Sequence, residues 1–275
     1  MSMLLSLTAW AAPWPDPGAS GVLSGVCEAS SLLWDDKQQR FIVADNETES
    51  TLFVFNPDFS PWTTVTFDGE VDDIEALAQP AAGLWVVGSQ SATKHAERKE
   101  DREKVVLLGG GAPPWTPDLH SCVACEAARG KAPNEGGLNV EGALVRQGQL
   151  WLGLRAPLVE GKAPLLKMNL DGRRIAELHA LGLGGLGVRE LLPWKDGFLV
   201  VAGPTDDRAV DHELWWFSAP NAVGRRLDVR LPPSTEGLAV NAAGDAVWVT
   251  DGDGKHGDCA VPSRWGVVSL AGVLP

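Results

Sequence analysis

Tyrosine is absent from this chain of 275 residues, and histidine occurs only five times. The sequence also contains no Gly-x-Ser-x-Gly nucleophile elbow, no His-Glu-x-x-His zinc motif and no P-loop. These absences exclude the motif-based forms of serine hydrolase, zinc peptidase and P-loop nucleotide hydrolase. Only one histidine, His120, lies near other residue types that commonly bind metals, namely the cysteines of His120-Ser-Cys122-Val-Ala-Cys125. Acid–base chemistry by histidine therefore has little support.

Dense basic clusters and long apolar runs are missing as well. The 36 acidic residues outnumber the 23 basic residues, which gives a formal net charge of −13. Such a chain repels phosphate backbones, so we expect no binding to nucleic acid. The longest apolar run, Met3 to Ala12, is much shorter than the roughly twenty residues that cross a bilayer. We therefore expect no membrane span.

The N-terminus and the cysteines bear on the cellular compartment. Ala9-Trp10-Ala11 has the small-x-small pattern of a signal-peptide cleavage site, but no basic residue precedes the apolar run. Residues 1–15 are therefore interpreted either as a signal-like segment or as a mobile, proline-rich leader. The four cysteines, an even number, suit an oxidising compartment. We expect a periplasmic or secreted protein, with a cytoplasmic protein as the alternative.

Short apolar runs recur between glycine, proline, asparagine and aspartate, and helical patterns are nearly absent. This pattern is typical of an all-β chain. Five of the runs follow copies of one short phrase, whose glutamates are Glu28, Glu75, Glu141, Glu190 and Glu236. Three of the four spacings between these glutamates are 46 to 49 residues, and the second is 66 residues. Repeats of this length predict a β-propeller.

The repeat predicts a single β-propeller domain over residues 16–275 with five blades. An insertion at about 109–137, rich in glycine, proline and cysteine, accounts for the long second spacing. A six-bladed ring, with the insertion counted as a blade, is the alternative. The last repeat has only three obvious strands, so we expect Gly21 to Val26 to add its outer strand. The N- and C-terminal strands would then close the ring in one blade and remove an exposed sheet edge.

The repeats also carry a resemblance to known propellers. Cys27-Glu28-Ala-Ser-Ser-Leu, Phe41-Ile-Val-Ala-Asp45 and Leu52-Phe-Val-Phe resemble the first blade of senescence marker protein and gluconolactonase propellers, in which a glutamate binds a divalent metal. Over Val26 to Asp253, the series is more similar to an uncharacterised bacterial propeller family, a domain of unknown function related to phytase-like esterases. The segments that carry this similarity include Asp73-Ile-Glu75, Asn139-Val-Glu141-Gly and Gly153-Leu-Arg155. The resemblance implies the fold and leaves the activity open.

The repeated glutamates predict an acidic channel mouth. Each lies at the start of the strand that lines the central channel, so Glu28, Glu75, Glu141 and Glu236 are expected to converge there. Like charges a few ångströms apart need a cation between them. One candidate is a divalent metal, with Ca²⁺ favoured, whose ligands would be completed by Asp45, Asn139 and Asp251. The other is Arg189, which takes the glutamate position if the fourth phrase is aligned one residue earlier. A third interpretation has each glutamate capping backbone N–H groups, without chemistry.

The ends of the second strands are expected to surround the same mouth. They supply Ser89 and Arg155, which with Arg189 suit an anionic small-molecule ligand. Alternatively, Arg155 pairs with a carboxylate of a neighbouring blade. We therefore predict a metal-dependent hydrolase of an ester, lactone or phosphoester, with Glu141, Glu75 and Arg155 as the catalytic residues. The alternative is a binding or scaffold propeller with a structural glutamate ring, whose insertion at 109–137 contacts a protein partner.

The cysteines are expected to form two disulfides. Cys27 precedes the first inner strand, and Cys259 lies in a loop of the last blade on the same face, so a Cys27–Cys259 bridge is predicted. For Cys122 and Cys125 we favour a disulfide inside the insertion. A zinc half-site has no second pair of ligands in the sequence, and a redox CxxC lacks its strand–helix context.

Overall fold

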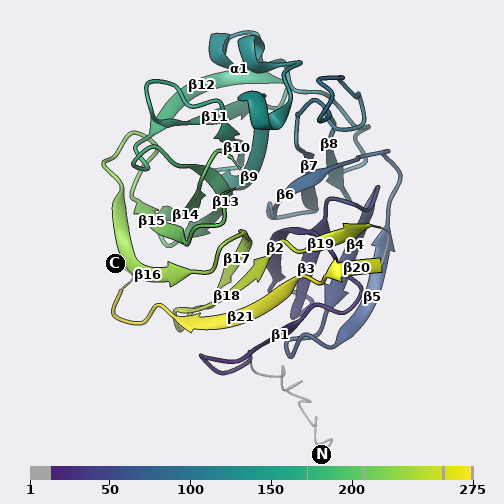
Figure 1. Ribbon diagram of the computed structural model, residues 1–275, viewed down its shortest axis with the longest axis vertical. Coiled ribbons are helices and arrows are strands. Elements are labelled where there is room, and N and C mark those ends of the chain that lie inside the picture. Colours follow the sequence, from purple (N-terminus) through teal and green to yellow (C-terminus); the bar gives the residue numbers. More distant parts are fainter. Residues whose placement is uncertain (1–13, 172, 207, 256–257, 274–275) are drawn as a thin grey trace, which may run out of the picture.

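The computed structural model describes residues 14–171, 173–206, 208–255 and 258–273. Most of the predicted leader, 1–15, lies outside these ranges. The described chain is nearly all β and forms a five-bladed propeller (Figure 1). Among the described residues, no helix is both long and apolar enough to cross a membrane.

Each blade is an antiparallel sheet, and its strands are arranged side by side from the central channel to the outer edge. Blades 1, 2 and 3 follow one another along the chain and comprise β2 (Ala29–Asp35), β3 (Arg40–Asp45), β4 (Thr51–Phe55) and β5 (Pro61–Thr66); β6 (Ile74–Ala78), β7 (Leu84–Gly88) and β8 (Val105–Leu108); and β9 (Asn139–Arg146), β10 (Gln149–Ala156), β11 (Ala163–Asn169) and β12 (Arg174–Leu181). Blades 4 and 5 comprise β13 (Gly187–Trp194), β14 (Gly197–Gly203), β15 (His212–Phe217) and β16 (Arg225–Leu231); and β17 (Thr235–Val240), β18 (Asp245–Thr250), β21 (Arg264–Ser269) and β1 (Ser20–Val22). A hairpin of β19 (Asp253–Lys255) and β20 (Asp258–Val261) joins β18 to β21.

Burial along each blade explains why the apolar runs form the inner strands. The second strand of blade 4, β14, is buried throughout, whereas the outer strand of blade 1, β5, is exposed throughout. Neighbouring blades cover both faces of the inner and second strands, so the side chains on both faces are apolar and the strands appear in the sequence as continuous apolar runs. Each aliphatic side chain buried between blades contributes about 1.5–3 kcal/mol to folding.

Blade 5 closes the ring as predicted. β1 pairs with β21 as the outer strand of that blade, with Gly21 opposite Trp265. Gly21 is required at this position because a Cβ there would lie 2.8 Å from Nε1 of Trp265. The indole of Trp265 also stacks on Phe59 of blade 1, with ring centroids 4.5 Å apart. Strand pairing and aromatic stacking therefore both hold the first and last blades together.

The six-bladed alternative is wrong, because the described part of the insertion forms no additional sheet. It contains α1 (Val123–Ala128) and the short 3₁₀ helix η1 (Pro133–Glu135), which pack beside blades 2 and 3. Blade 2 has only three strands, and Trp115 makes a single antiparallel bridge to Val105 where a fourth strand would run. Figure 1 shows α1 at the outer rim, away from the channel.

Candidate functional site at the channel mouth

A β-bulge at the same place in every inner strand defines the channel mouth. In each blade, the register between the first and second strands skips one residue of the first strand. A bulge re-aims the side chain of the residue that it leaves unpaired. The five skipped residues are Ser30, Glu75, Glu141, Arg189 and Glu236.

The bulge corrects two alignments of the repeat. In blade 1 the equivalent of the glutamates is Ser30, and Glu28 lies two residues earlier, before the strand begins. In blade 4 the equivalent is Arg189 and not Glu190, which pairs with Val201 in regular register. The ring at the mouth is therefore one serine, three glutamates and one arginine.

Arg189 lies between two of those glutamates. Its Nη1 is 2.9 Å from Oε2 of Glu141 and 2.6 Å from Oε1 of Glu236. Nη1 of Arg155 adds a bond of 3.0 Å to Oε1 of Glu141, which also accepts from Nδ2 of Asn139 at 2.7 Å. Burial lowers the pKa of Arg189, but the carboxylates of Glu141 and Glu236 outweigh burial and hold the pKa above its usual value. We call these four residues (Glu141, Arg155, Arg189 and Glu236) the arginine side of the mouth.

In the opposite half of the mouth, the carboxyl groups form no ion pair with a described residue. We call it the acceptor side, and it consists of Glu28, Asn46, Glu75 and Asp251. Burial, and after it the charge of Asp73, raises the pKa of Glu75 well above its usual range. Burial and the neighbouring Glu28 raise the pKa of Asp251 to about 7. Among the hydrogen bonds described, Glu75 has only a long one, of 3.4 Å, from Nδ2 of Asn46.

Several buried oxygen atoms at the mouth have no hydrogen-bond donor among the described residues. They are Asn46 Oδ1, Asn139 Oδ1, Glu236 Oε2 and Asp251 Oδ1. Burial raises the pKa of Glu236 to about 8 although Arg189 opposes the shift. A buried acceptor without a donor costs about 1–3 kcal/mol. Carboxyl protons, water or a bound cation would each relieve that cost.

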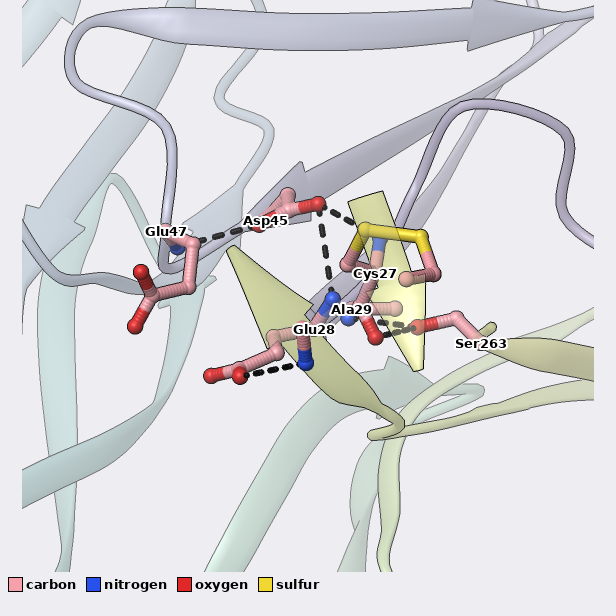
Figure 2. Close-up of a disulfide and its surroundings, with 8 residues drawn as sticks. Cys27, Glu28, Ala29, Asp45, Glu47 and Ser263 are labelled. Carbon is pink, nitrogen blue, oxygen red and sulfur yellow. Dashed lines mark hydrogen bonds between the residues drawn. A yellow bond between two sulfur atoms is a disulfide. The ribbon is translucent and has the colours of Figure 1, made fainter. Parts of the chain in front are cut away.

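The predicted metal ligands fall into different surroundings. Asp45 is committed to the backbone, because its Oδ2 accepts from the N–H of Cys27 (2.9 Å) and its Oδ1 from that of Glu47 (3.0 Å), as Figure 2 shows. Oε1 of Glu28 accepts from the backbone N–H of Gly254 in the β19–β20 hairpin, at 3.2 Å. In the described ranges, no three His, Cys, Asp or Glu side chains are grouped to hold one metal ion.

Ser89 lies behind the mouth. Its side chain is fully buried, and its Oγ donates to Oγ of Ser91 (2.8 Å), which donates to Oδ2 of Asp73 (3.1 Å). Its carbonyl accepts from the N–H of Val140 in the next blade. Ser89 therefore belongs to a hydrogen-bonded chain that joins blades 2 and 3, and it has no surface open to a ligand.

Glu190 has a role that the repeat does not indicate. Its Oε2 reaches blade 1, where it accepts from Oγ of Ser31 (2.7 Å) and the N–H of Leu32 (3.5 Å), and its Oε1 accepts from the N–H of Leu191. Gly237 of blade 5 lies next to this contact, since a Cβ there would be 2.5 Å from the nitrogen of Leu32. Burial raises the pKa of Glu190 well above its usual range, against those hydrogen bonds. Glu190 thus ties blade 4 to blade 1 below the ring.

His212 is a second residue that sequence reasoning missed. It is 2% exposed at the start of β15, and its Nδ1 lies 3.2 Å from the carbonyl of Val210. Burial and the neighbouring Arg189 lower its pKa to about 4, so the imidazole is neutral. Gly203 makes room for the ring, because a Cβ there would lie 2.3 Å from Nε2 of His212 and 3.0 Å from Cγ of Arg189. His212 therefore supports Arg189 from behind.

Both expected cysteine pairs are disulfide-bonded. Cys27–Cys259 joins the start of blade 1 to the β19–β20 hairpin of blade 5, next to Glu28 (Figure 2). Ser263 strengthens the same junction, since its Oγ donates to the carbonyl of Cys27 and accepts from the N–H of Ala29. Cys122–Cys125 is buried in the insertion, where Sγ of Cys122 caps α1.

A cavity of about 230 Å³ lies further along the five inner strands, beyond the ring. Three consecutive residues at or near the end of each inner strand line it, for example Leu144 and its two neighbours on β9 and Leu191 to Pro193 on β13. The backbones of the inner strands therefore form its wall, as expected for the axial channel itself. The titrating groups of the mouth are not part of it.

The fold and the mouth define the protein as a five-bladed β-propeller with a mixed carboxylate and arginine ring. Residues 130–229 match the model of a family described as "Protein of unknown function (DUF3616)". This match and the fold support an uncharacterised β-propeller family; the more specific resemblance to phytase-like esterases or gluconolactonases stays a prediction.

Comparison with solved structures bears on the fold alone. GH43B of the Bacteroides ovatus xyloglucan PUL is 11% identical, with a TM-score of 0.51 over 90% of this chain and 54% of that chain. A luciferin-regenerating enzyme is 11% identical, with a TM-score of 0.46 over 92% of this chain and 96% of that one. Hydrazine synthase of Kuenenia stuttgartiensis is 9% identical, with a TM-score of 0.44 over 83% of this chain and 58% of that chain. No curated protein matches the sequence.

Proposed function

We propose that the channel mouth binds a divalent cation of the Ca²⁺ type on its acceptor side and, with it, a small anionic ligand. The observation that carries the proposal is the surplus of acceptor oxygens, of which Asn46 Oδ1 and Asp251 Oδ1 on the acceptor side are buried without a donor among the described residues. Nη1 of Arg189 is shared between Glu141 and Glu236, and the pKa of Asp251 stays raised to about 7 although the charge of Arg189 opposes the shift. Ca²⁺ takes six to eight oxygen ligands and accepts carboxylates, amide oxygens and water together.

The acceptor side fits such an ion if two carboxylates at most bind it directly. This limit follows because no group of three acidic, His or Cys side chains among the described residues is suited to one ion. On the acceptor side, Glu75 and Asp251 have raised pKa values, which a bound cation would lower by stabilising their ionised forms. The amide oxygen of Asn46 has no donor among the described residues and could serve as a further ligand. Water would complete the ligand set.

Hydrolysis of an ester, lactone or phosphoester is the second candidate function. Asp251 favours it, because a carboxyl group with a pKa of about 7 exchanges protons near neutral pH. A bound cation would supply Lewis-acid polarisation of the substrate oxygen. Both oxygens of Glu141 are held by arginines, so Glu75 and Asp251 are better placed than Glu141 to exchange a proton with a substrate. An assay with p-nitrophenyl esters and phosphates separates a hydrolase from a binding propeller. A hydrolase turns them over, and Asp251→Asn abolishes the turnover while the fold stays intact.

A periplasmic or extracellular location is part of the proposal. Two disulfides and no free cysteine among the described residues support it, since reducing compartments disfavour disulfides.

Calcium is expected to raise the melting temperature of chelator-treated protein by about 5–10 °C at a hundredfold excess over Kd, because binding stabilises by about 2.7 kcal/mol there. Glu75→Gln is expected to abolish this rise while leaving the calcium-free protein at least as stable as wild type, since it removes a buried uncompensated carboxyl group. Differential scanning fluorimetry measures both. The matched control is Glu100→Gln, at an exposed position. An unchanged calcium response in Glu75→Gln would contradict the assignment.

The metal-free protein is expected to lose stability as pH rises from about 5 to 8. The pKa values of Asp251 and Glu236 are about 7 and about 8 in the folded chain, above the ordinary 3.8 and 4.5. Between those limits the folded state binds more protons than the unfolded state, so raising the pH favours unfolding. Melting temperatures in EDTA across this range measure the slope. Asp251→Asn should flatten it and the exposed Asp196→Asn should not; equal slopes in both variants would refute the cause.

A further inference from the structure

The outer strand of blade 1 is unlike the other outer strands. β5 is the last strand of its sheet, and all six of its residues are exposed. Its sequence, Pro-Trp-Thr-Thr-Val-Thr, contains no charged residue. The outer strands of blades 3 and 4 carry charged residues (Arg174 and Glu177 on β12; Arg225, Arg226, Asp228 and Arg230 on β16), and β1 is only three residues long. β8 of blade 2 is uncharged as well, but none of its residues is exposed and Trp115 bridges to Val105 at its edge. Charges, shortness, proline and bulges are the usual protections of an edge against pairing with another chain. β5 has only the last two, Pro61 and a bulge at Trp62, and both lie at its N-terminal end.

The exposed side chains of β5 suit an interface. Trp62 is 60% exposed and Val65 is 42% exposed. The guanidinium of Arg40 lies 4.5 Å from the centroid of the Trp62 ring, which holds the indole in one position. Exposed, rigidly held tryptophans are enriched among the residues that dominate binding energy at interfaces.

The register of β5 identifies the backbone groups that face outward. The N–H of Phe67 donates to the carbonyl of Ser50, so Phe67 faces β4. Because antiparallel residues alternate in the side to which their backbone groups point, Val65 also faces β4, and Thr64 and Thr66 face away. β5 lies at the rim of the molecule in Figure 1, where these two residues can receive another strand.

An acidic pocket of about 560 Å³ adjoins the Thr66 end of the strand. Its lining includes Glu49, Thr66, Asp68, Glu70 and Lys104. Lys104 pairs with Glu70 at 3.2 Å, but neither Glu49 nor Asp68 forms an ion pair with a described residue. The pocket therefore complements a basic side chain at the end of any strand that lies along β5.

We propose that β5 is a docking site for an extended segment of a partner protein, which adds to blade 1 as a fifth strand and places a lysine or arginine in the Glu49–Asp68 pocket. Main-chain hydrogen bonds to Thr64 and Thr66 provide the affinity, and the acidic pocket fixes direction and register. This surface is separate from the channel mouth, so the proposal stands whether or not the mouth binds a cation.

The test uses an acetylated, fluorescent nine-residue peptide in which two lysines precede alternating threonine and valine, and a second peptide with the lysines last. Fluorescence anisotropy with the full chain is expected to show saturable binding of one of them. Thr64→Pro is expected to weaken binding about tenfold or more, since it removes an outward N–H and an edge strand tolerates proline. Thr64→Val, which keeps the N–H, should bind as wild type does.

Two further variants keep the outcome decisive. Val65→Lys places a charge on the edge and should weaken binding even if Thr64→Pro fails to fold. Glu49→Gln with Asp68→Asn should abolish the preference for lysine-bearing over lysine-free peptide. Absence of binding of both peptides at millimolar concentration, or equal binding by wild type and Val65→Lys, would overturn the proposal.

Discussion

Replacing Arg189 with methionine is expected to lower the free energy of unfolding by about 3–5 kcal/mol, because it leaves the buried Glu236 without a paired cation and Glu141 with Arg155 alone. Nη1 of Arg189 lies within 3 Å of both Glu141 and Glu236, and all three side chains are buried. For a chain of this size the loss corresponds to a melting temperature lower by about 10 °C. Thermal and urea unfolding measure it.

Arg208→Met is the control, since Arg208 pairs with Asp206 at the surface, where an ion pair contributes little. Adding Glu236→Gln to Arg189→Met should restore part of the lost stability by removing one of the two like charges. Equal stability of Arg189→Met and wild type would show that the glutamates are compensated by something other than this guanidinium.

Removal of the Cys27–Cys259 bridge should destabilise the propeller by about 2–5 kcal/mol. The bridge joins residues 232 apart in the sequence, so it closes nearly the whole ring, and a long closed loop restricts the unfolded chain strongly. The bridge also holds the β19–β20 hairpin beside Glu28 at the mouth. Urea unfolding of Cys27→Ala/Cys259→Ala measures the effect.

The second disulfide supplies the matched control. Cys122 and Cys125 are only three residues apart, so the loss of loop-closure entropy in Cys122→Ala/Cys125→Ala is small. The loss of stability should therefore be clearly smaller for this pair. A larger effect for the short bridge would mean that buried packing in the insertion, and not closure of the ring, dominates the contribution of the disulfides.

The fold was predictable because each blade repeats one local pattern. A phrase that ends in a buried inner strand is followed by a turn and a second apolar run, and both are visible in the sequence. The shortage of strands in the last repeat also predicted the closure by β1, although that strand is shorter than the expected Gly21 to Val26. The three-stranded blade 2 was not foreseen, because Trp115 lies within an insertion that matches no repeat.

The site was predictable only in part, since it depends on register. Glu28 has the right residue type in the right phrase, yet the bulge that aims a side chain into the mouth falls on Ser30. The choice between Arg189 and Glu190 was open for the same reason, since one residue of register separates them. Pattern and spacing do not specify where a bulge lies.

Contacts between distant blades were beyond sequence reasoning altogether. Glu190 bonds to Ser31, which is 159 residues away, across a glycine of a third blade. His212 lies against Arg189 because Gly203 has no side chain to separate them. Such contacts are set by closure of the ring, and no repeat of one blade contains them.

The cation site is the central claim, and a crystal structure of the protein soaked in calcium chloride tests it most directly. Anomalous difference density collected at long wavelength locates the ion without assuming its ligands. The account predicts one peak on the acceptor side of the mouth, within about 2.6 Å of a Glu75 or Asp251 oxygen. Absence of a peak at the mouth, with Glu75 and Asp251 hydrogen-bonded to each other or to water, would contradict it.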